Sequence, residues 1–160
     1  MKIRNGFITN SSSSSFIVAF PYAPKSVKDV QKLLFGDEDL ITCYDETART
    51  ADVAKRVFSD LKNQRPNDMS SIVGNMDPDI DHSDFTSVDG SFAEKMYQLA
   101  LKRIAQHDAD TFISESAEIL GVSKNDMAIY VFDYGDDSGD GLFEHGEIFG
   151  ALPYKQISHH

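Results

Sequence analysis

The sequence lacks several features that would assign it to a functional class. It has a single cysteine, Cys43, so neither an internal disulfide nor a paired-cysteine zinc site can form. No apolar run approaches the roughly 18 residues that a membrane span needs. The apolar stretch at residues 16–20 is too short for a secretory signal and ends at Pro21. We therefore expect a cytoplasmic protein with no membrane partner.

Catalytic signatures and positive charge are also scarce. The nucleophile elbow, the phosphate-binding loop, the dinucleotide-binding glycine pattern and the H-E-x-x-H zinc motif are all missing. Lysine and arginine total 15 against 26 acidic residues, which gives a net charge of -11. No basic residue lies between Arg65 and Lys95. Such a field repels phosphate backbones, so we expect no direct nucleic-acid binding and a partner with a basic surface.

The first half of the chain predicts a strand followed by two helices. Residues 16–20 form a β-branched and aromatic run typical of a buried strand. Ser26 opens a helix that Gly36 should end, and a short strand is expected at 40–44. Thr50 is the expected N-cap of a helix reaching about residue 62. We expect residues 66–90 to form an irregular acidic insertion.

The second half predicts helices and then strands. A helix should run from Ser91 to about residue 107, with its apolar residues at helical spacing: Met96, Leu99, Ala100 and Ile104. A separate helix is expected at 110–120, closed by Gly121. A strong strand signal at 127–132 and weaker ones at 142–149 and 152–157 follow. We expect one α+β domain over residues 1–160, with a mostly antiparallel sheet of three to five strands and about four helices on one face.

A run of five serines, residues 11–15, directly precedes the first strand. Composition alone fits a flexible linker, and an anion-binding nest of amides and hydroxyls is a second alternative. The run contains no glycine or lysine to support the nest. We predict a tight turn and strand entry, in which four residues bond backbone near the C-terminal segment: Asn10, Ser11, Ser12 and Ser13.

An acidic, glycine-rich stretch after residue 133 has the spacing of a calcium-binding loop. Alternate oxygens of a turning loop can converge on one hard cation, and a closing glutamate completes the shell. The positions that match are Asp136, Ser138, Asp140, Glu144 and Glu147. A strand signal precedes the loop, so an EF-hand does not fit, whereas a cation-binding loop between two strands does. The alternative is an ordinary hairpin turn of the same composition.

Histidines near these carboxylates suggest a second kind of metal site. His145, His159 and His160 could supply imidazole ligands beside one or two carboxylates. The divalent cation would then be Ca²⁺, Mg²⁺ or Zn²⁺. The alternatives are surface histidines, or a terminal pair left from a purification tag.

Both ends of the chain resemble one set of proteins. The head Arg4-Asn-Gly-Phe-Ile-Thr-Asn-Ser-Ser-Ser-Ser-Ser-Phe16 is similar to the opening of small uncharacterised proteins of tailed bacteriophages and bacteria. The tail, Glu144-His145-Gly146 followed by Ile157-Ser158-His159-His160, resembles the end of the same set. The resemblance implies a viral origin and a native histidine terminus, and it implies no activity.

Three functional hypotheses remain open. The first is a phage accessory or virion-associated protein that acts through protein–protein interaction, with or without a structural metal ion. It would work in the cytoplasm of the infected bacterial host or in the virion. The second is a metal-dependent hydrolase using the Asp/Glu/His cluster. The third is an acidic DNA mimic that occupies a basic groove of a host protein. The missing catalytic motifs favour a function that is not enzymatic.

Overall fold

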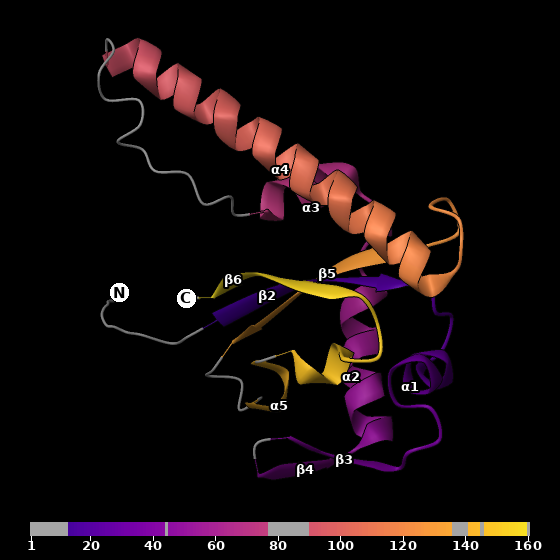
Figure 1. Cartoon of the computed structure of the whole chain (residues 1–160). Helices are drawn as coiled ribbons and strands as arrows, with labels where there is room; N and C mark the ends of the chain where they lie inside the picture. Colours follow the sequence, from indigo (N-terminus) through magenta and orange to yellow (C-terminus); the bar gives the residue numbers. More distant parts are fainter. Residues whose placement is uncertain (1–12, 44, 77–89, 136–140, 145, 160) are drawn as a thin grey trace.

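The computed structural model describes residues 13–43, 45–76, 90–135, 141–144 and 146–159 (Figure 1). Helices and strands alternate irregularly along the chain, as the α+β class requires. In chain order the elements are β2 (Ser13–Phe20), α1 (Val27–Phe35), β3 (Leu40–Cys43), β4 (Glu46–Arg49), α2 (Thr50–Leu61), α3 (Met69–Asn75), α4 (Gly90–Leu120), β5 (Ala128–Gly135), α5 (Gly141–Glu144), the 3₁₀ helix η3 (Glu147–Phe149) and β6 (Tyr154–His159).

The main sheet has three antiparallel strands in the order β5-β2-β6. The central strand β2 pairs along its length with β5, with Phe16 opposite Phe132. Its other edge pairs with β6, where the register shifts between Ser15 and Phe16. A separate two-stranded sheet is the hairpin β3–β4. The antiparallel sheet and the α+β class confirm the sequence prediction.

Helices cover both faces of the main sheet, not one face as the sequence analysis expected. In β2, Phe16, Val18 and Phe20 point into one core with α1 and α2, whereas Ile17 and Ala19 point into a second core with α3 and α4. All five side chains are fully buried. Because alternate residues of a strand face opposite ways, an unbroken apolar run requires cover on both sides. Figure 1 shows α3 and α4 on one side and α1, α2 and α5 on the other.

The helix ends predicted in the first half of the chain are confirmed, with one exception. The Ser26 side chain accepts a hydrogen bond from the Asp29 amide at 3.2 Å, and Gly36 ends α1 at a φ of 60°. Thr50 is not the N-cap of α2, because Arg49 holds that position. The buried Thr50 hydroxyl instead donates to the Glu38 carbonyl at 2.6 Å. This hydrogen bond therefore holds the loop that follows α1 against the start of α2.

The two helices expected at 91–107 and 110–120 are one continuous helix, α4, of 31 residues. No glycine or proline separates them, so nothing interrupts the hydrogen-bond ladder. The predicted stop at Gly121 is confirmed. Its φ is 69°, and the Val122 amide donates back to the Ala117 carbonyl at 3.2 Å. This backward bond is typical of the Schellman arrangement that closes a helix.

Other elements differ from the sequence prediction. The strand expected at 142–149 is wrong, because this segment forms α5 and η3. The strands expected at 40–44, 127–132 and 152–157 correspond to β3, β5 and β6. Within the stretch 66–90, the helix α3 was not expected. Asp68 caps it by accepting from the Ser71 amide at 3.4 Å.

The outer edge of β5 is covered by two amide side chains. The Gln64 side chain accepts from the Val131 amide at 2.9 Å and donates to the Val131 carbonyl at 2.5 Å. Two residues further along the strand, Asn67 accepts from the Ile129 amide at 2.9 Å and donates to the Met127 carbonyl at 2.6 Å. The pair reproduces the bonds of a neighbouring strand, which blocks edge-to-edge association.

Among the described helices, none combines the length and the hydrophobicity that a bilayer crossing demands.

Candidate functional site

The serine run enters the fold as the first residues of β2. Ser14 lies opposite His159 of β6 and opposite Tyr134 of β5, and Ser15 lies opposite Ser158. The Ser14 side chain is fully buried and accepts a hydrogen bond from the Gln156 side-chain amide, Nε2, at 3.3 Å. Ser14 and Ser15 therefore meet the C-terminal segment, whereas the prediction named Asn10, Ser11, Ser12 and Ser13 for this role.

The predicted turn is not confirmed at Ser13. That residue is already part of β2 and pairs with Gly135, so its backbone is extended. The neighbouring Ser15 hydroxyl donates to the Asp133 carboxylate of β5. Asn10, Ser11 and Ser12 lie outside the described residues. The described serines therefore stabilise the sheet through backbone pairing and two side-chain hydrogen bonds.

One residue of the head and one of the tail that carry the resemblance are in contact in the core. Phe16 directly follows the serine run, and its ring lies against Gly146, where a β-carbon would sit 2.6 Å from Phe16 Cε1. Gly146 has a φ of 77°, a conformation that other residues rarely adopt. The glycine thus allows the close approach of the 146–150 turn to β2. This contact explains part of both motifs in terms of packing.

Most of the candidate metal ligands lie outside the described residues: Asp136, Ser138, Asp140, His145 and His160. Of the others, Glu144 ends α5, Glu147 begins η3 and is exposed, and His159 lies in β6. Within the described ranges, no three histidine, cysteine or carboxylate side chains gather as a metal site would need. The cation-binding loop therefore stays a prediction.

A fixed positive charge lies beside the residues that flank this loop. The Arg56 guanidinium of α2 stacks on the rings of Tyr134 and Phe143, at 5.5 and 5.3 Å from their centroids. These rings come just before and just after residues 136–140 in sequence. A cation in the loop would have to overcome this repulsion with several carboxylates. Arg56 also pairs with Asp60 at 3.5 Å, which reduces its effect.

The single thiol is not activated for chemistry. Burial raises the pKa of Cys43 above its ordinary value, and the nearby Glu147 carboxylate raises it further. A nucleophilic cysteine needs the opposite shift, toward the thiolate at neutral pH. The raised pKa favours the neutral thiol form of Cys43.

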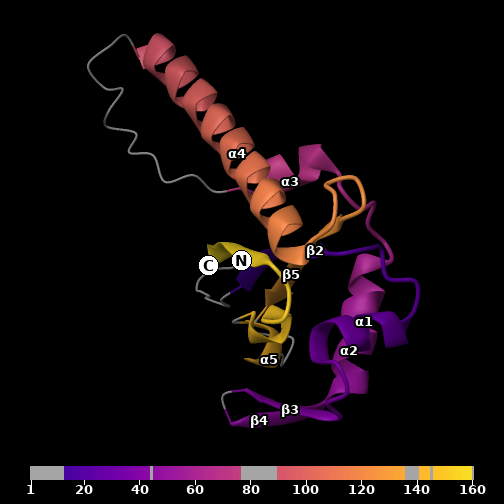
Figure 2. The ribbon, with the colours of Figure 1, turned by 45° about the vertical axis from the view of Figure 1, so that its right-hand side comes forward.

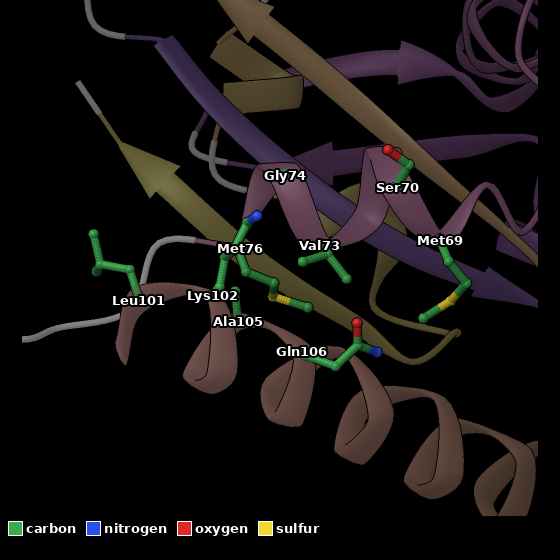
Figure 3. Close-up of a pocket in the computed structure, with 9 residues that line it drawn as sticks. All are labelled: Met69, Ser70, Val73, Gly74, Met76, Leu101, Lys102, Ala105 and Gln106. Carbon is green, nitrogen blue, oxygen red and sulfur yellow. The ribbon is translucent and has the colours of Figure 1, made fainter. Parts of the chain in front are cut away.

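An apolar groove lies between α3 and α4 (Figure 3). It encloses about 520 Å³. Figure 3 shows the side chains of Met69, Val73 and Met76 reaching from α3 toward α4. Lys102 and Gln106 supply polar groups from the α4 side. Methionines suit a binding surface, because their unbranched side chains adapt to different partners.

The outer side of α4 carries a second apolar surface. Four large side chains are strongly exposed there: Phe92 (54%), Met96 (40%), Leu99 (51%) and Ile104 (40%). Three of them, Met96, Leu99 and Ile104, line a hollow of about 350 Å³. These residues account for four of the eight exposed large hydrophobic side chains in the described part of the chain. Much of the apolar residue pattern that predicted this helix is thus presented to solvent.

Two apolar faces on one helix follow from the spacing of its residues. Phe92, Met96 and Leu99 lie along one stripe, whereas Ala105 and Ala109 are buried on another. The stripe continues to Arg103, and Ala105 lies about 200° further round the helix at 100° per residue. We call residues 90–107 the α4 arm, and the row Phe92, Met96, Leu99 and Arg103 the outer stripe. Figures 1 and 2 both show the arm projecting beyond the sheet.

Charge divides α4 at the end of the arm. The arm contains Lys95, Lys102 and Arg103 against a single acid, Glu94. The remainder of the helix carries only acidic side chains: Asp108, Asp110, Glu115 and Glu118. None of the three basic residues forms an ion pair with another described residue. The arm is therefore a basic, apolar surface on an acidic protein.

Sequence reasoning missed both the groove and the exposure of the stripe. The groove needs α3, which was not expected, and it forms between segments that are distant in sequence. A usable signal existed for the stripe, because α4 has apolar residues on more than one side. Helical spacing shows that a face is apolar, but it does not say whether the cover comes from the same chain.

Comparisons with known proteins found no matching family model, no matching curated protein and no matching solved structure.

Proposed function

We propose that this protein is an accessory protein that acts by binding another protein through the α4 arm. The observation that carries the proposal is the apolar character of the arm on two sides, one lining the α3–α4 groove and one exposed along the outer stripe. An apolar face of a helix is normally covered by another element. A second protein would supply the cover that the described part of this chain does not.

The size of the exposed surface supports this function. Single exposed apolar side chains are common on monomeric proteins, whereas a contiguous patch marks an interaction site. Met96, Leu99 and Ile104 line one hollow together, and Phe92 extends the same side by a further turn. A groove of about 520 Å³ on the side that faces α3 adds a concave surface that can receive a side chain or a helix.

The biological setting is proposed from the resemblance. A phage accessory or virion-associated role places the partner in the infected bacterium or in the particle. The resemblance rests on the head and the tail, of which Phe16 and Gly146 are in contact in the described part of the chain. The fold and the binding surface are therefore separate parts of this molecule.

Site-specific photocrosslinking tests the proposal. A photoreactive residue at Gln106, on the groove, should yield one discrete crosslinked partner from cells that make the protein in its native setting. The matched control carries the same residue at Lys155, which is exposed on β6. Adding Ala105→Glu, which puts a charge at the groove wall, should remove the product. Equal products from both positions, or none from either, would contradict the proposal.

Neither alternative function gains a specific observation. The hydrolase needs Asp136, Asp140 and His145, which lie outside the described residues. The DNA mimic rests on net charge, and the most prominent surface of the described chain is basic and apolar. Both remain hypotheses drawn from the sequence.

A further inference from the structure

We infer that the outer stripe binds an amphipathic helix whose apolar face is flanked by aspartate or glutamate. The inference rests on the proposed function, since it names the chemistry of the partner that the arm would receive. Two properties carry it: the spacing of the stripe and the sign of the charge around it.

The stripe has the spacing of a helix–helix seam. Its members follow one another at intervals of four, three and four residues: Phe92, Met96, Leu99 and Arg103. Such intervals place side chains in one row along a helix that faces a second helix. From Phe92 to Arg103 the row is about 16 Å long, at 1.5 Å per residue. The hollow beside Met96 and Leu99 gives a partner side chain a place to insert.

The charge around the stripe selects the partner. Lys95 and Lys102 lie one position before Met96 and Arg103, so both border the same side of the seam. In paired helices the residues at this position contact the partner's flanking side chains. Arg103 adds a positive charge within the row itself. Acidic flanks on the partner would neutralise all three charges, and basic flanks would add repulsion.

A second copy of the chain fits this surface poorly. In an antiparallel pairing that packs Met96 against Leu99, Phe92 of each copy would lie against Arg103 of the other. Lys95 would then approach Lys102 across the seam. In a parallel pairing the two Arg103 side chains would meet. Each arrangement brings like charges together, and like-charge contacts disfavour association.

The test uses the full chain and two synthetic helical peptides of about 18 residues. Both peptides carry leucine at seam spacing, and they differ only in having glutamate or lysine at the flanking positions. Binding is measured by fluorescence anisotropy at low and high salt. The glutamate peptide should bind roughly tenfold more tightly or better at low salt, and added salt should reduce the difference.

Variants locate the binding to the stripe. Leu99→Glu should abolish binding of the glutamate peptide, whereas Ile119→Glu, an equally drastic change at an exposed residue of the other half of α4, should leave it unchanged. Reversing the charges with Lys95→Glu, Lys102→Glu and Arg103→Glu together should make the lysine peptide the tighter ligand. Far-ultraviolet circular dichroism confirms that each variant is folded.

The remaining outcomes overturn the inference in distinguishable ways. Equal binding of both peptides would refute the acidic partner and leave the proposed docking function intact. Failure of both peptides, together with loss of the Gln106 crosslink, would refute both proposals. A dimer in sedimentation that Leu99→Glu dissolves would make the occupant a second copy. Tighter binding to anionic vesicles than to the glutamate peptide would make it a lipid surface. If neutralising the aspartates of residues 77–89 strengthens peptide binding, the occupant is the chain's own acidic segment.

Discussion

The contact between Gly146 and Phe16 predicts a large effect from one methyl group. In Gly146→Ala the new β-carbon would lie 2.6 Å from Phe16 Cε1 and 3.1 Å from Tyr154 Cε2. Phe16 is fully buried in the core, so its ring has little room to move. Atoms cannot remain at such distances, and either the ring or the 146–150 turn must shift.

Two physical terms set the magnitude of the destabilisation. An alanine at a φ of 77° costs about 1–2 kcal/mol, because its β-carbon crowds the following carbonyl. Overpacking a filled core adds about 1–3 kcal/mol. The free energy of unfolding should therefore fall by about 2–5 kcal/mol, which lowers Tm by about 4–20 °C in a domain of this size.

Gly121→Ala provides the matched control. Gly121 has a similar φ of 69°, but nothing lies within 4 Å of the position its β-carbon would take. This variant should lose only the backbone term, about 1–2 kcal/mol. Urea denaturation, monitored by circular dichroism, gives the free energy of unfolding of both variants. The comparison is valid if that free energy falls with urea concentration at the same slope in each. If Gly146→Ala is no less stable than Gly121→Ala, the packing explanation is wrong.

A double-mutant cycle tests the named contact directly. Phe16→Leu removes the ring edge that the new methyl group would strike, so the double variant should be more stable than the two separate losses predict. The expected coupling energy is about 1 kcal/mol or more. Simple additivity would show that the strain lies elsewhere in the turn.

Three further predictions concern other parts of the molecule. Gln64→Leu removes both side-chain bonds to Val131 and should lower the free energy of unfolding by about 1–3 kcal/mol and promote aggregation, measured by urea denaturation and light scattering; unchanged values would show that the β5 edge needs no cover. Because burial and the Glu147 carboxylate raise the pKa of Cys43, Glu147→Gln should lower that pKa and shift the pH profile of iodoacetamide alkylation to lower pH, and an unchanged profile would contradict the electrostatic cause. If the acidic loop binds Ca²⁺, saturation at about 100 times the dissociation constant should stabilise the protein by about 2.7 kcal/mol in a thermal melt, and Asp140→Asn should remove the effect; no shift in the parent protein would leave the loop an ordinary turn.

Elements marked by short-range signals could be predicted from the sequence. Ser26, Gly36 and Gly121 act on backbone groups within a few residues, so their capping roles are confirmed. The buried strand at 16–20 is confirmed as well, and its unbroken apolar run already implied cover on both faces. The split of α4 into two helices was wrong, because no residue at the boundary breaks a helix.

Features that depend on distant partners could not be predicted. Gln64 and Asn67 look like ordinary loop residues until β5, more than sixty positions later, lies beside them. The segment 142–149 is apolar enough for a strand, but the space beside Phe16 and Phe149 accommodates short helical turns instead. The candidate metal ligands remain a prediction from spacing alone.

The position of β2 also affects when the protein can fold. Ser14 pairs with His159, so 145 positions separate two residues that are neighbours in the sheet. Contacts so distant in sequence slow folding, because a long loop must close before they form. On the ribosome, β2 is synthesised early and then has to wait for β5 and β6 while its fully apolar residues, including Phe16 and Phe20, lack their final neighbours. The polar serines at the start of this strand lower its tendency to aggregate during that interval.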